Sequence, residues 1–542
     1  MNNALFKFES PNNEPIQQFA KNSKERATLV EELKRLSSGQ IEIPLIIGGK
    51  EIRTGKTLDV VMPHNHKHIL AKCHQASEKE IALAIDEALK AKREWENLSW
   101  IERSSVMLKA AELLSKKYRN VMLAATMLGQ SKNPYQAEID ATCENIDFLR
   151  YNAHFASQIY AGQPKSMETQ LNRLEYRALE GFVFAVTPFN FTSIASNLNG
   201  SPVLMGNATV WKPASTALFS NYFMMKIFQE AGVPDGVINF VPARGSLIGD
   251  VVTKHKDLAG IHFTGSSGTF NHLWKAVGQN IENYTSYPKL VGETGGKDFI
   301  FVHNSADSQE VATAIIAGGF EYQGQKCSAT SRVYIPKSMW AEVKQKLQEQ
   351  IAEIKVGDVT DFSNFMNAVI DEKSFDNIMS YIDFAKKSSS CKIITGGTGD
   401  KSVGYFVQPT IIETTDPYFK TMQEEIFGPV VTIYVYDDKD YEKTLELCNK
   451  TSIYGLTGAV FANDRYAVVK AYNTLRYAAG NFYINDKPSG AVVGLQPFGG
   501  SRASGTNDKA GASTNLLRWV SPRAIKETYI PANTFKMPFM EI

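Results

Sequence analysis

From residue 182 onward, short β-rich runs alternate with helical segments, and this alternation limits the folds open to the chain. Strands joined through helices favour parallel pairing, because a parallel connection needs a crossover of about a dozen residues or more. The sequence therefore predicts an α/β fold with helices on both faces of a parallel sheet. The expected strands of this first unit lie at 182–187, 209–212, 237–241 and 260–264, with helices at 216–231 and 247–254.

The same alternation resumes after residue 297 and predicts a second α/β unit. A chain of 542 residues is too long for one ordinary hydrophobic core, so two or more domains are expected. We place the seam between the units near residue 291. The second unit is expected to hold helices at 307–322 and 338–354 and strands at 331–335, 430–436, 458–461 and 481–485.

The first 180 residues have a different pattern, in which helices follow a β-rich stretch at 41–58. Ser77 can cap a helix, and Glu80 completes a capping box three residues later. Residues 1–40 are polar and are expected to form a helical or irregular extension. Further helices are expected at about 101–127 and 134–160, and a strand or hairpin at 171–180.

Charge, cysteine usage and hydropathy exclude several classes of function. The net charge of +1 gives no electrostatic footprint for nucleic acid or for an anionic membrane, and no apolar run of about 18 residues predicts a membrane span. Five scattered cysteines form neither a disulfide framework nor a zinc pattern. His64, His66 and His68 alternate, but no carboxylate or cysteine accompanies them, so we expect no metal. The N-terminal sequence does not resemble a targeting signal, and we therefore expect a cytoplasmic protein.

One cysteine lies in a sequence unlike that around a core cysteine. Cys327 follows Gly324-Gln325-Lys326 and precedes Ser328. A thiolate is a good nucleophile, but an unperturbed thiol with a pKa of about 8.5 is mostly protonated at neutrality, so a catalytic role requires activation. The structural alternative is a small buried residue, which is the commoner fate of a free cysteine.

Two further segments carry polar side chains that such chemistry could use. Glu293 is surrounded by Gly292, Gly295 and Gly296, which indicates an unusual backbone path around one carboxylate, and a general base needs such positioning. Asn190 follows an expected strand, and its amide is a good donor to a developing oxyanion. The structural alternatives are a solvated glutamate in a connecting turn and an asparagine used for turn formation.

A glycine-containing turn stands where an expected strand meets an expected helix, at residues 263–268. Backbone N–H groups at a helix N-terminus bind anions, and glycine lets a phosphate approach the backbone. The spacing differs from the G-x-G-x-x-G fingerprint, so an ordinary strand–helix turn is the alternative. In the helix expected at 134–160, Asp140, Glu144 and Asp147 share one side, and such an acidic face is normally solvated.

Together, and in this order, these segments resemble the aldehyde dehydrogenase superfamily, over a stretch from about residue 45 to the C-terminus. A narrower resemblance, to the branch that oxidises L-glutamate γ-semialdehyde, rests on residues 189–192, 272–275, 457–461, 479–487 and 501–507. The motifs shared with the whole superfamily lie at 187–190, 211–213, 263–266, 293–297, 324–327, 425–429 and 497–500.

The resemblance implies a Rossmann-type cofactor domain, an α/β catalytic domain and a small oligomerisation element. The NAD-binding domain would comprise residues 1–164 and 181–291, and the catalytic domain residues 292–485. Residues 165–180 and 486–542 would form the oligomerisation element and the C-terminal tail. The implied assembly is a homodimer or a larger homo-oligomer, formed through 171–180 and 516–529.

The resemblance also assigns roles to the three candidate catalytic residues. Cys327 would add to the aldehyde as a thiolate, and the Asn190 side chain with the Cys327 backbone N–H would hold the oxyanion. After oxidation to a thioester, Glu293 would activate the water that hydrolyses it. Covalent capture divides one difficult oxidation into two easier steps.

The implied cofactor is NAD. Many NAD-specific relatives carry a glutamate three residues after the lysine of the 211–213 motif, whereas this chain has Ser215, which would not repel a 2′-phosphate; NAD over NADP therefore rests on the narrower resemblance. The implied cofactor-binding residues are Thr187, Lys212, Gly265, Ser266, Gly268, Glu425 and Phe427.

The narrower resemblance implies that the substrate is L-glutamate γ-semialdehyde, formed by ring opening of 1-pyrroline-5-carboxylate. Ser328, Gly490 and Ala491 would bind its carboxylate, Phe191 and Phe498 would flank its aliphatic chain, and Glu144 would lie near its amino end. The reaction belongs to proline catabolism, so a transient contact with proline dehydrogenase is a further expectation.

Three alternatives remain open at this point. The same fold could oxidise another semialdehyde with NAD or NADP. A cysteine hydrolase would pair Cys327 with a histidine, which no nearby motif supplies. A non-catalytic binding protein would not need Cys327, Glu293 and Asn190 together.

Overall fold

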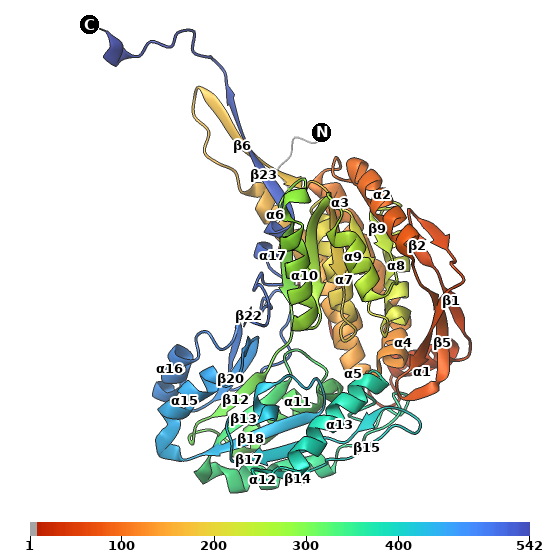
Figure 1. Cartoon of the computed structure of the whole chain (residues 1–542), viewed down its shortest axis with the longest axis vertical. Coiled ribbons are helices and arrows are strands. Elements are labelled where there is room, and N and C mark those ends of the chain that lie inside the picture. The colour runs from red at the N-terminus through yellow and green to blue at the C-terminus, as the bar shows by residue number, and fades with distance from the viewer. Residues whose placement is uncertain (1–7, 542) are drawn as a thin grey trace.

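Two seven-stranded sheets organise the molecule, one in each half of the chain (Figure 1). The structure is a computed structural model that describes residues 8–541. The first sheet has the order β11-β10-β7-β8-β9-β2-β3. Its strands are β2 (Leu45–Ile47), β3 (Lys50–Ile52), β7 (Phe182–Val186), β8 (Thr209–Lys212), β9 (Ile238–Phe240), β10 (Leu258–Thr264) and β11 (Lys289–Glu293).

The strands from β7 to β11 pair in parallel, as the alternation predicted, and helices cover both faces of this sheet. Phe182 and Phe184 of β7 pack on one face, and Val183 and Ala185 pack on the other. Such two-sided burial explains why these strands read as continuous apolar runs. One face carries α2 (Glu78–Trp95), α9 (Gly245–Thr253) and α10 (Ser267–Gln279); the other carries α3 (Trp100–Ser115), α4 (Arg119–Gln130), α7 (Thr192–Leu204) and α8 (Leu218–Ala231).

The N-terminal helical region differs from the expectation in two places. The helix expected at 101–127 is divided, because the chain turns at residues 116–118 between α3 and α4. Lys116 and Lys117 at this turn are exposed, whereas nearly every residue of α4 is buried, so packing rather than helix propensity sets the break. The helix expected at 134–160 consists of α5 (Pro134–Ala137), a π-helix (Glu138–Glu144) and α6 (Asn145–Ala161).

The second sheet has the order β14-β17-β18-β13-β12-β20-β21, and only its edge strand β14 runs antiparallel. Its strands are β12 (Asp298–Val302), β13 (Thr330–Pro336), β14 (Cys391–Thr395), β17 (Thr410–Thr414), β18 (Val430–Tyr436), β20 (Thr457–Phe461) and β21 (Asn481–Ile484). Its helices are α11 (Ser308–Phe320) and α12 (Lys337–Ala352) on one face, and α13 (Glu372–Lys386), α15 (Tyr441–Lys450) and α16 (Arg465–Thr474) on the other.

Smaller elements complete the body. A helix, α1 (Lys24–Ser37), lies within the expected polar extension, and residues 1–7 of that extension lie outside the described part of the chain. A three-stranded sheet contains β1 (Ile41–Ile43), β4 (Thr57–Met62) and β5 (Asn65–His74). Short elements are β15 (Gly399–Asp400), β16 (Phe406–Val407), α14 (Lys420–Gln423), β19 (Tyr454–Gly455), β22 (Ser501–Arg502) and α17 (Ser513–Leu517).

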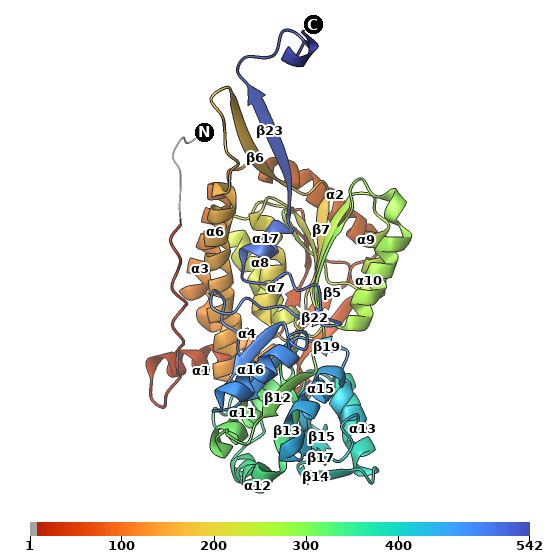
Figure 2. The same cartoon turned by 90° about the vertical axis from the view of Figure 1, so that its left-hand side faces the viewer.

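A two-stranded arm projects from the body (Figures 1 and 2). It pairs β6 (Gln170–Ala178) with β23 (Val520–Thr528), antiparallel along their whole length. The two strands come from the two segments expected to form the oligomerisation element. The assignment of that element and of the cofactor and catalytic domains stays a prediction.

Within residues 8–541, no helix combines the length and the apolar composition that crossing a bilayer requires. The same residues contain no group of three or more His, Cys, Asp or Glu side chains arranged to hold a metal ion. His64 is buried, and His66 stacks on Tyr405 in the second half of the chain.

Candidate active site

Cys327 lies at the end of a loop whose backbone is held in an uncommon conformation. After α11 the chain passes through three consecutive residues with positive φ, at Tyr322 (51°), Gln323 (57°) and Gly324 (65°). A side chain is strained in this region, so the surrounding structure must impose it. Gln323 supplies part of that restraint, because its amide donates to the carbonyls of Ser131 (2.9 Å) and Ala368 (2.8 Å).

Asn190 reaches the same loop from the first half of the chain. It follows β7 and is 3% exposed. Its Nδ2 donates to the carbonyl oxygen of Gln325 at 3.1 Å, two residues before Cys327. The two predicted residues are thus brought together, with an amide donor beside the backbone that carries the thiol.

Glu293 is the last residue of β11, at the point where the chain leaves the first sheet. Its Oε2 accepts a hydrogen bond from the Gly500 N–H at 3.2 Å. Burial raises the pKa of Glu293 well above its ordinary value, and the nearby Lys509 opposes that shift. A carboxyl with a raised pKa can accept a proton near neutrality, which suits a general base.

Gly295 and Gly296 connect the two sheets where no side chain would fit. A Cβ at Gly295 would lie 2.2 Å from Oε2 of Glu425, and one at Gly296 would lie 2.1 Å from the carbonyl oxygen of Cys327. The Gly296 N–H donates to Oε1 of Glu425 at 2.8 Å. This close approach brings three groups together at one junction. They are the backbone that follows Glu293, the backbone at Cys327 and the Glu425 carboxylate.

The surroundings of Cys327 hold its thiol protonated. Burial raises the pKa of Cys327 well above its ordinary value, and the neighbouring Asp298, Glu425 and Glu293 raise it further. The adjacent Lys326 does not offset them, because its Nζ pairs with Glu321 at 2.9 Å. Lys326 is therefore next to Cys327 in the sequence without making a contact that would lower the pKa of its thiol.

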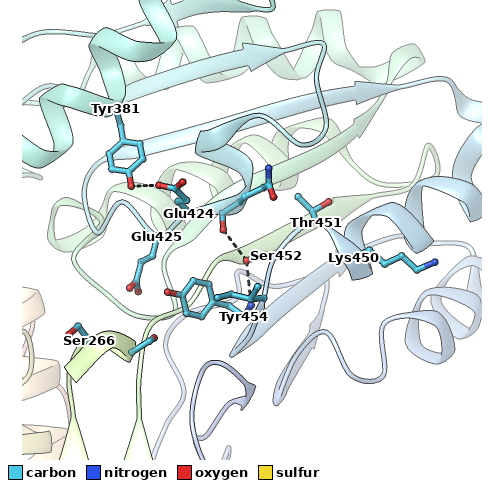
Figure 3. A pocket seen from close by; sticks show the side chains of 12 residues that line it. Ser266, Tyr381, Glu424, Glu425, Lys450, Thr451, Ser452 and Tyr454 are labelled. Carbon is cyan, nitrogen blue, oxygen red and sulfur yellow. Dashed lines mark hydrogen bonds between the residues drawn. The ribbon is translucent and has the colours of Figure 1, made fainter. Parts of the chain in front are cut away.

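A cavity of about 510 Å³ opens between the two halves of the chain beside this junction (Figure 3). On one wall, Ser266 and Gly268 lie at the N-terminus of α10, where Ser266 Oγ accepts from the Thr269 N–H at 3.3 Å. Glu425 and Tyr454 lie on the opposite wall. A helix N-terminus facing a polar cavity suits an anionic group such as a phosphate.

Three other predicted cofactor residues, Thr187, Lys212 and Gly265, lie at or just after the carboxyl ends of β7, β8 and β10, and Phe427 lies in the loop before β18. Thr187 Oγ accepts a hydrogen bond from the indole of Trp211 at 2.9 Å, so it also supports β8. Burial lowers the pKa of Lys212, and no acidic side chain in residues 8–541 pairs with it. Phe427 has a φ of 58° and packs edge-on against Phe189. The Gly265 N–H donates to the Glu293 carbonyl oxygen at 3.2 Å, which joins the turn to β11.

The acidic side chains at 140–147 are not a solvated face, which corrects the sequence interpretation. Asp140 is fully buried, and Asp147 is 3% exposed. Asp140 accepts hydrogen bonds from the first N–H groups of α7, at Thr192 (3.0 Å) and Ser193 (2.9 Å). The positive end of a helix stabilises a buried carboxylate, and this explains its position.

Lys132 is a buried residue that the sequence analysis missed. Its Nζ pairs with Asp140 at 2.7 Å and lies over two aromatic rings, those of Phe191 (4.1 Å) and Tyr322 (4.4 Å). It therefore connects a predicted substrate residue with the Cys327 loop. Its sequence context, a lysine after Ser131 in a loop, carries no signal, because the contacts come from distant segments.

The remaining predicted substrate residues come from several segments. Glu144 accepts from Ser193 Oγ at 3.0 Å, and burial, then Asp140, raises its pKa to about 8. Gly490 has a φ of 92°, and Ala491 follows it in the same loop. Ser328 is 7% exposed and forms no hydrogen bond with that loop within residues 8–541, whereas Phe498 is half-buried and its backbone pairs with Ala510.

Comparison with known proteins identifies the family and the fold. A sequence model described as the aldehyde dehydrogenase family matches residues 51–525. The chain belongs to the aldehyde dehydrogenase family. That membership confirms the resemblance on which the sequence interpretation rested, including its fold class.

Two relatives of known sequence and one solved structure show which members of the family the chain resembles. The chain is 51% identical to a mitochondrial delta-1-pyrroline-5-carboxylate dehydrogenase of Dictyostelium discoideum, over 98% of this chain and 96% of the relative. It is 49% identical to the human mitochondrial protein of that name, over 98% of this chain and 94% of the relative. A crystal structure of the Mycobacterium tuberculosis delta-pyrroline-5-carboxylate dehydrogenase bound with NAD aligns with a TM-score of 0.96 at 48% identity and covers 100% of both chains.

The acidic surroundings of Cys327 predict how fast its thiol is alkylated. Replacing Glu425→Gln keeps an acceptor for the Gly296 N–H and removes one negative charge, so the pKa of Cys327 falls and more thiolate is present. At about pH 8.5, where Glu425 is ionised, iodoacetamide should modify Cys327 a few-fold faster than in the native chain. Peptide mass spectrometry measures the rate. The matched control is Glu424→Gln on the exposed neighbour; equal rates in all three proteins would contradict the account.

Proposed function

We propose that this aldehyde dehydrogenase oxidises L-glutamate γ-semialdehyde, in equilibrium with 1-pyrroline-5-carboxylate, to L-glutamate with NAD, as a step of proline catabolism. The observation that carries the proposal is the junction of Cys327, Glu293 and Asn190 beside a polar cavity. Relatives named for this reaction, at about half identity over nearly the whole chain, support the choice of substrate.

Cys327 forms the covalent intermediate. The thiol passes its proton to solvent water, the sulfur adds to the aldehyde carbon, and the carbonyl oxygen becomes the oxyanion of a thiohemiacetal. Asn190 Nδ2 and the Cys327 N–H stabilise that oxyanion. Because burial and three nearby carboxyl groups raise the pKa of the Cys327 thiol, addition is coupled to removal of that proton.

The chemistry of the residues that line the cavity suits the cofactor NAD. The N-terminus of α10 at Ser266 and Gly268 suits the diphosphate, Glu425 suits a ribose hydroxyl, and Lys212 is a half-buried lysine with no acidic partner in residues 8–541. When bound, NAD supplies the hydride acceptor that converts the thiohemiacetal into a thioester. Thr187, Gly265 and Phe427 would complete the cofactor site, as the family resemblance implies.

Glu293 completes the reaction as the base for hydrolysis. Its carboxylate removes a proton from water, the hydroxide oxygen adds to the thioester carbon, and the carbon–sulfur bond breaks to release glutamate and the Cys327 sulfur. Since burial raises the pKa of Glu293, hydrolysis slows as the pH falls and this carboxyl becomes protonated.

The substrate carries two charged groups on its α-carbon, a carboxylate and an ammonium group, and they call for different partners. Backbone N–H groups of Gly490 and Ala491, with Ser328, suit the carboxylate. Phe191 and Phe498 flank the aliphatic chain. The Glu144 carboxyl suits the ammonium group, whose charge would offset the burial that raises the Glu144 pKa.

We further infer a homo-oligomer of at least two chains. The arm of β6 and β23 stands away from the body, and the tail beyond it exposes Ile530 (79%), Phe535 (81%) and Phe539 (84%) (Figure 1). A second copy of the chain could cover these apolar side chains. A transient contact with proline dehydrogenase and a cytoplasmic location stay predictions, and the Dictyostelium and human relatives are named as mitochondrial proteins.

Pyrroline-5-carboxylate oxidation tests the function and the nucleophile together. The native chain should form NADH, followed by absorbance, and Cys327→Ala should lose activity by roughly 10⁴-fold or more, because no other group can carry the acyl intermediate. Cys391→Ala, a change at another partly exposed cysteine, is the matched control and should retain activity. If the native chain oxidises a different semialdehyde and not this one, the family assignment stands and the substrate is wrong.

Replacement of Glu144 should change the product. A γ-glutamyl thioester whose α-amino group is uncharged can cyclise, because the nitrogen attacks the thioester carbon within the same molecule and gives 5-oxoproline. A carboxylate at Glu144 keeps that group as an ammonium ion without a lone pair. Glu144→Gln should therefore raise KM and yield 5-oxoproline beside glutamate, as measured by chromatography. Ser193→Ala, which keeps the charge, should yield mainly glutamate; unchanged KM and product in Glu144→Gln would refute this role.

A further inference from the structure

The N-terminal segment from residue 8 to 22 lies against the helices that carry the acidic side chains. Figure 2 shows it running beside α3 and α6 down to α1. Glu14 pairs with Arg119 and Arg150, each at 2.7 Å, and its N–H donates to Asp147 Oδ1 at 2.8 Å. The Gln17 N–H donates to a buried carboxylate, Glu138, at 2.9 Å. These contacts fix the middle of the segment, at Glu14 and Gln17, along the body.

Asn13 is the residue of this segment that reaches beyond the helices. Its Nδ2 donates to Asp147 Oδ2 at 2.7 Å and also to the carbonyl oxygen of Val493 at 2.8 Å. Its Oδ1 accepts from the Tyr151 hydroxyl at 3.3 Å. One amide thus joins α6 to the loop at 489–494, which contains Gly490 and Ala491.

That loop has few other restraints. Within residues 8–541, the Asn13 hydrogen bond is the only one that reaches residues 489–494 from outside 489–496. Val493 packs on Phe148 and Tyr151, and Gly494, with a φ of 83°, lies against the Tyr151 ring where a Cβ would be 2.2 Å away. Packing against Tyr151 therefore fixes how closely the loop approaches α6. The hydrogen bond from Asn13 sets the orientation of the loop's peptide groups.

We propose that Asn13 is a positioning residue for substrate recognition, which holds the 489–494 loop so that the N–H groups of Gly490 and Ala491 face the substrate carboxylate. Val493 is two residues from Ala491, so rotation of its peptide group would propagate to these donors. The proposal rests on the proposed function for the identity of the carboxylate. Asn13 itself touches no reacting atom.

The first test separates recognition from chemistry. Asn13→Ala should raise KM for pyrroline-5-carboxylate about tenfold, the effect of one lost directed hydrogen bond, and should change kcat much less. Oxidation of propionaldehyde, which has no carboxylate, should keep its native kcat/KM. An unchanged KM, or an equal loss with both aldehydes, would overturn the proposal.

An exchange of side chains separates loop positioning from attachment of the segment. In Asn13→Asp with Asp147→Asn, the new amide at 147 can donate to the new carboxylate at 13 and still accept from the Glu14 N–H, whereas nothing donates to the Val493 carbonyl. The urea midpoint should stay near native while KM stays raised as in Asn13→Ala. A KM that returns to the native value would show that attachment alone matters and would overturn the proposal.

Amide hydrogen exchange gives a readout that does not depend on activity. Peptides covering 489–494 should exchange faster in both variants, with those covering the Cys327 loop unchanged. If the native chain does not oxidise pyrroline-5-carboxylate, the proposed function fails while this result still decides whether Asn13 holds the loop. Unchanged exchange at 489–494 would overturn the inference whatever the substrate.

Discussion

The site depends on how closely the backbone at Gly295 and Gly296 approaches the Glu425 side chain and the Cys327 backbone. The chain leaves the first sheet at Glu293 and enters the second at Asp298, and between them it passes against the Cys327 carbonyl and the Glu425 carboxylate. Any side chain at these glycines would force the sheets apart. The base, the nucleophile and the cavity wall are therefore fixed relative to one another by the connection between the sheets.

The same packing concentrates acidic groups around the thiol. Burial raises the pKa of Asp298 to about 8 and that of Glu425 to about 7, and both carboxyl groups raise the pKa of Cys327. The resting site thus holds a protonated thiol among weakly acidic carboxyl groups. Such a site suppresses adventitious reactions of the cysteine and makes thiolate formation depend on what binds, because a cationic ligand would shift the same balance.

The sequence predicted the parts of the molecule whose signal is local. Strand–helix alternation located both sheets, since strands such as β8 and β10 are short buried runs between two helices. Cys327, Glu293 and Asn190 stood out because polar residues beside glycines are unlike a core, and the family motifs then gave them roles. The capping box at Ser77 and Glu80 likewise depends on neighbours within one turn.

The features that escaped prediction depend on contacts between distant segments. Helix α7 contains Pro202 and several polar residues, yet it forms because it is buried and because Asp140, about fifty residues earlier, caps its N-terminus. Lys132 and Asn13 act through Phe191, Tyr322 and Val493, which no spacing rule connects to them. The acidic side chains at 140 and 147 were interpreted as solvated because the segments that bury them are also distant in the sequence.

The covalent intermediate on Cys327 is the central claim, and a blocked hydrolysis step exposes it most directly. Glu293→Gln mixed with NAD and pyrroline-5-carboxylate should form about one NADH per subunit and then stop. Mass spectrometry of the quenched protein should find the peptide containing Cys327 heavier by glutamate less water. Steady NADH formation by this variant with no modified Cys327 peptide would contradict the account.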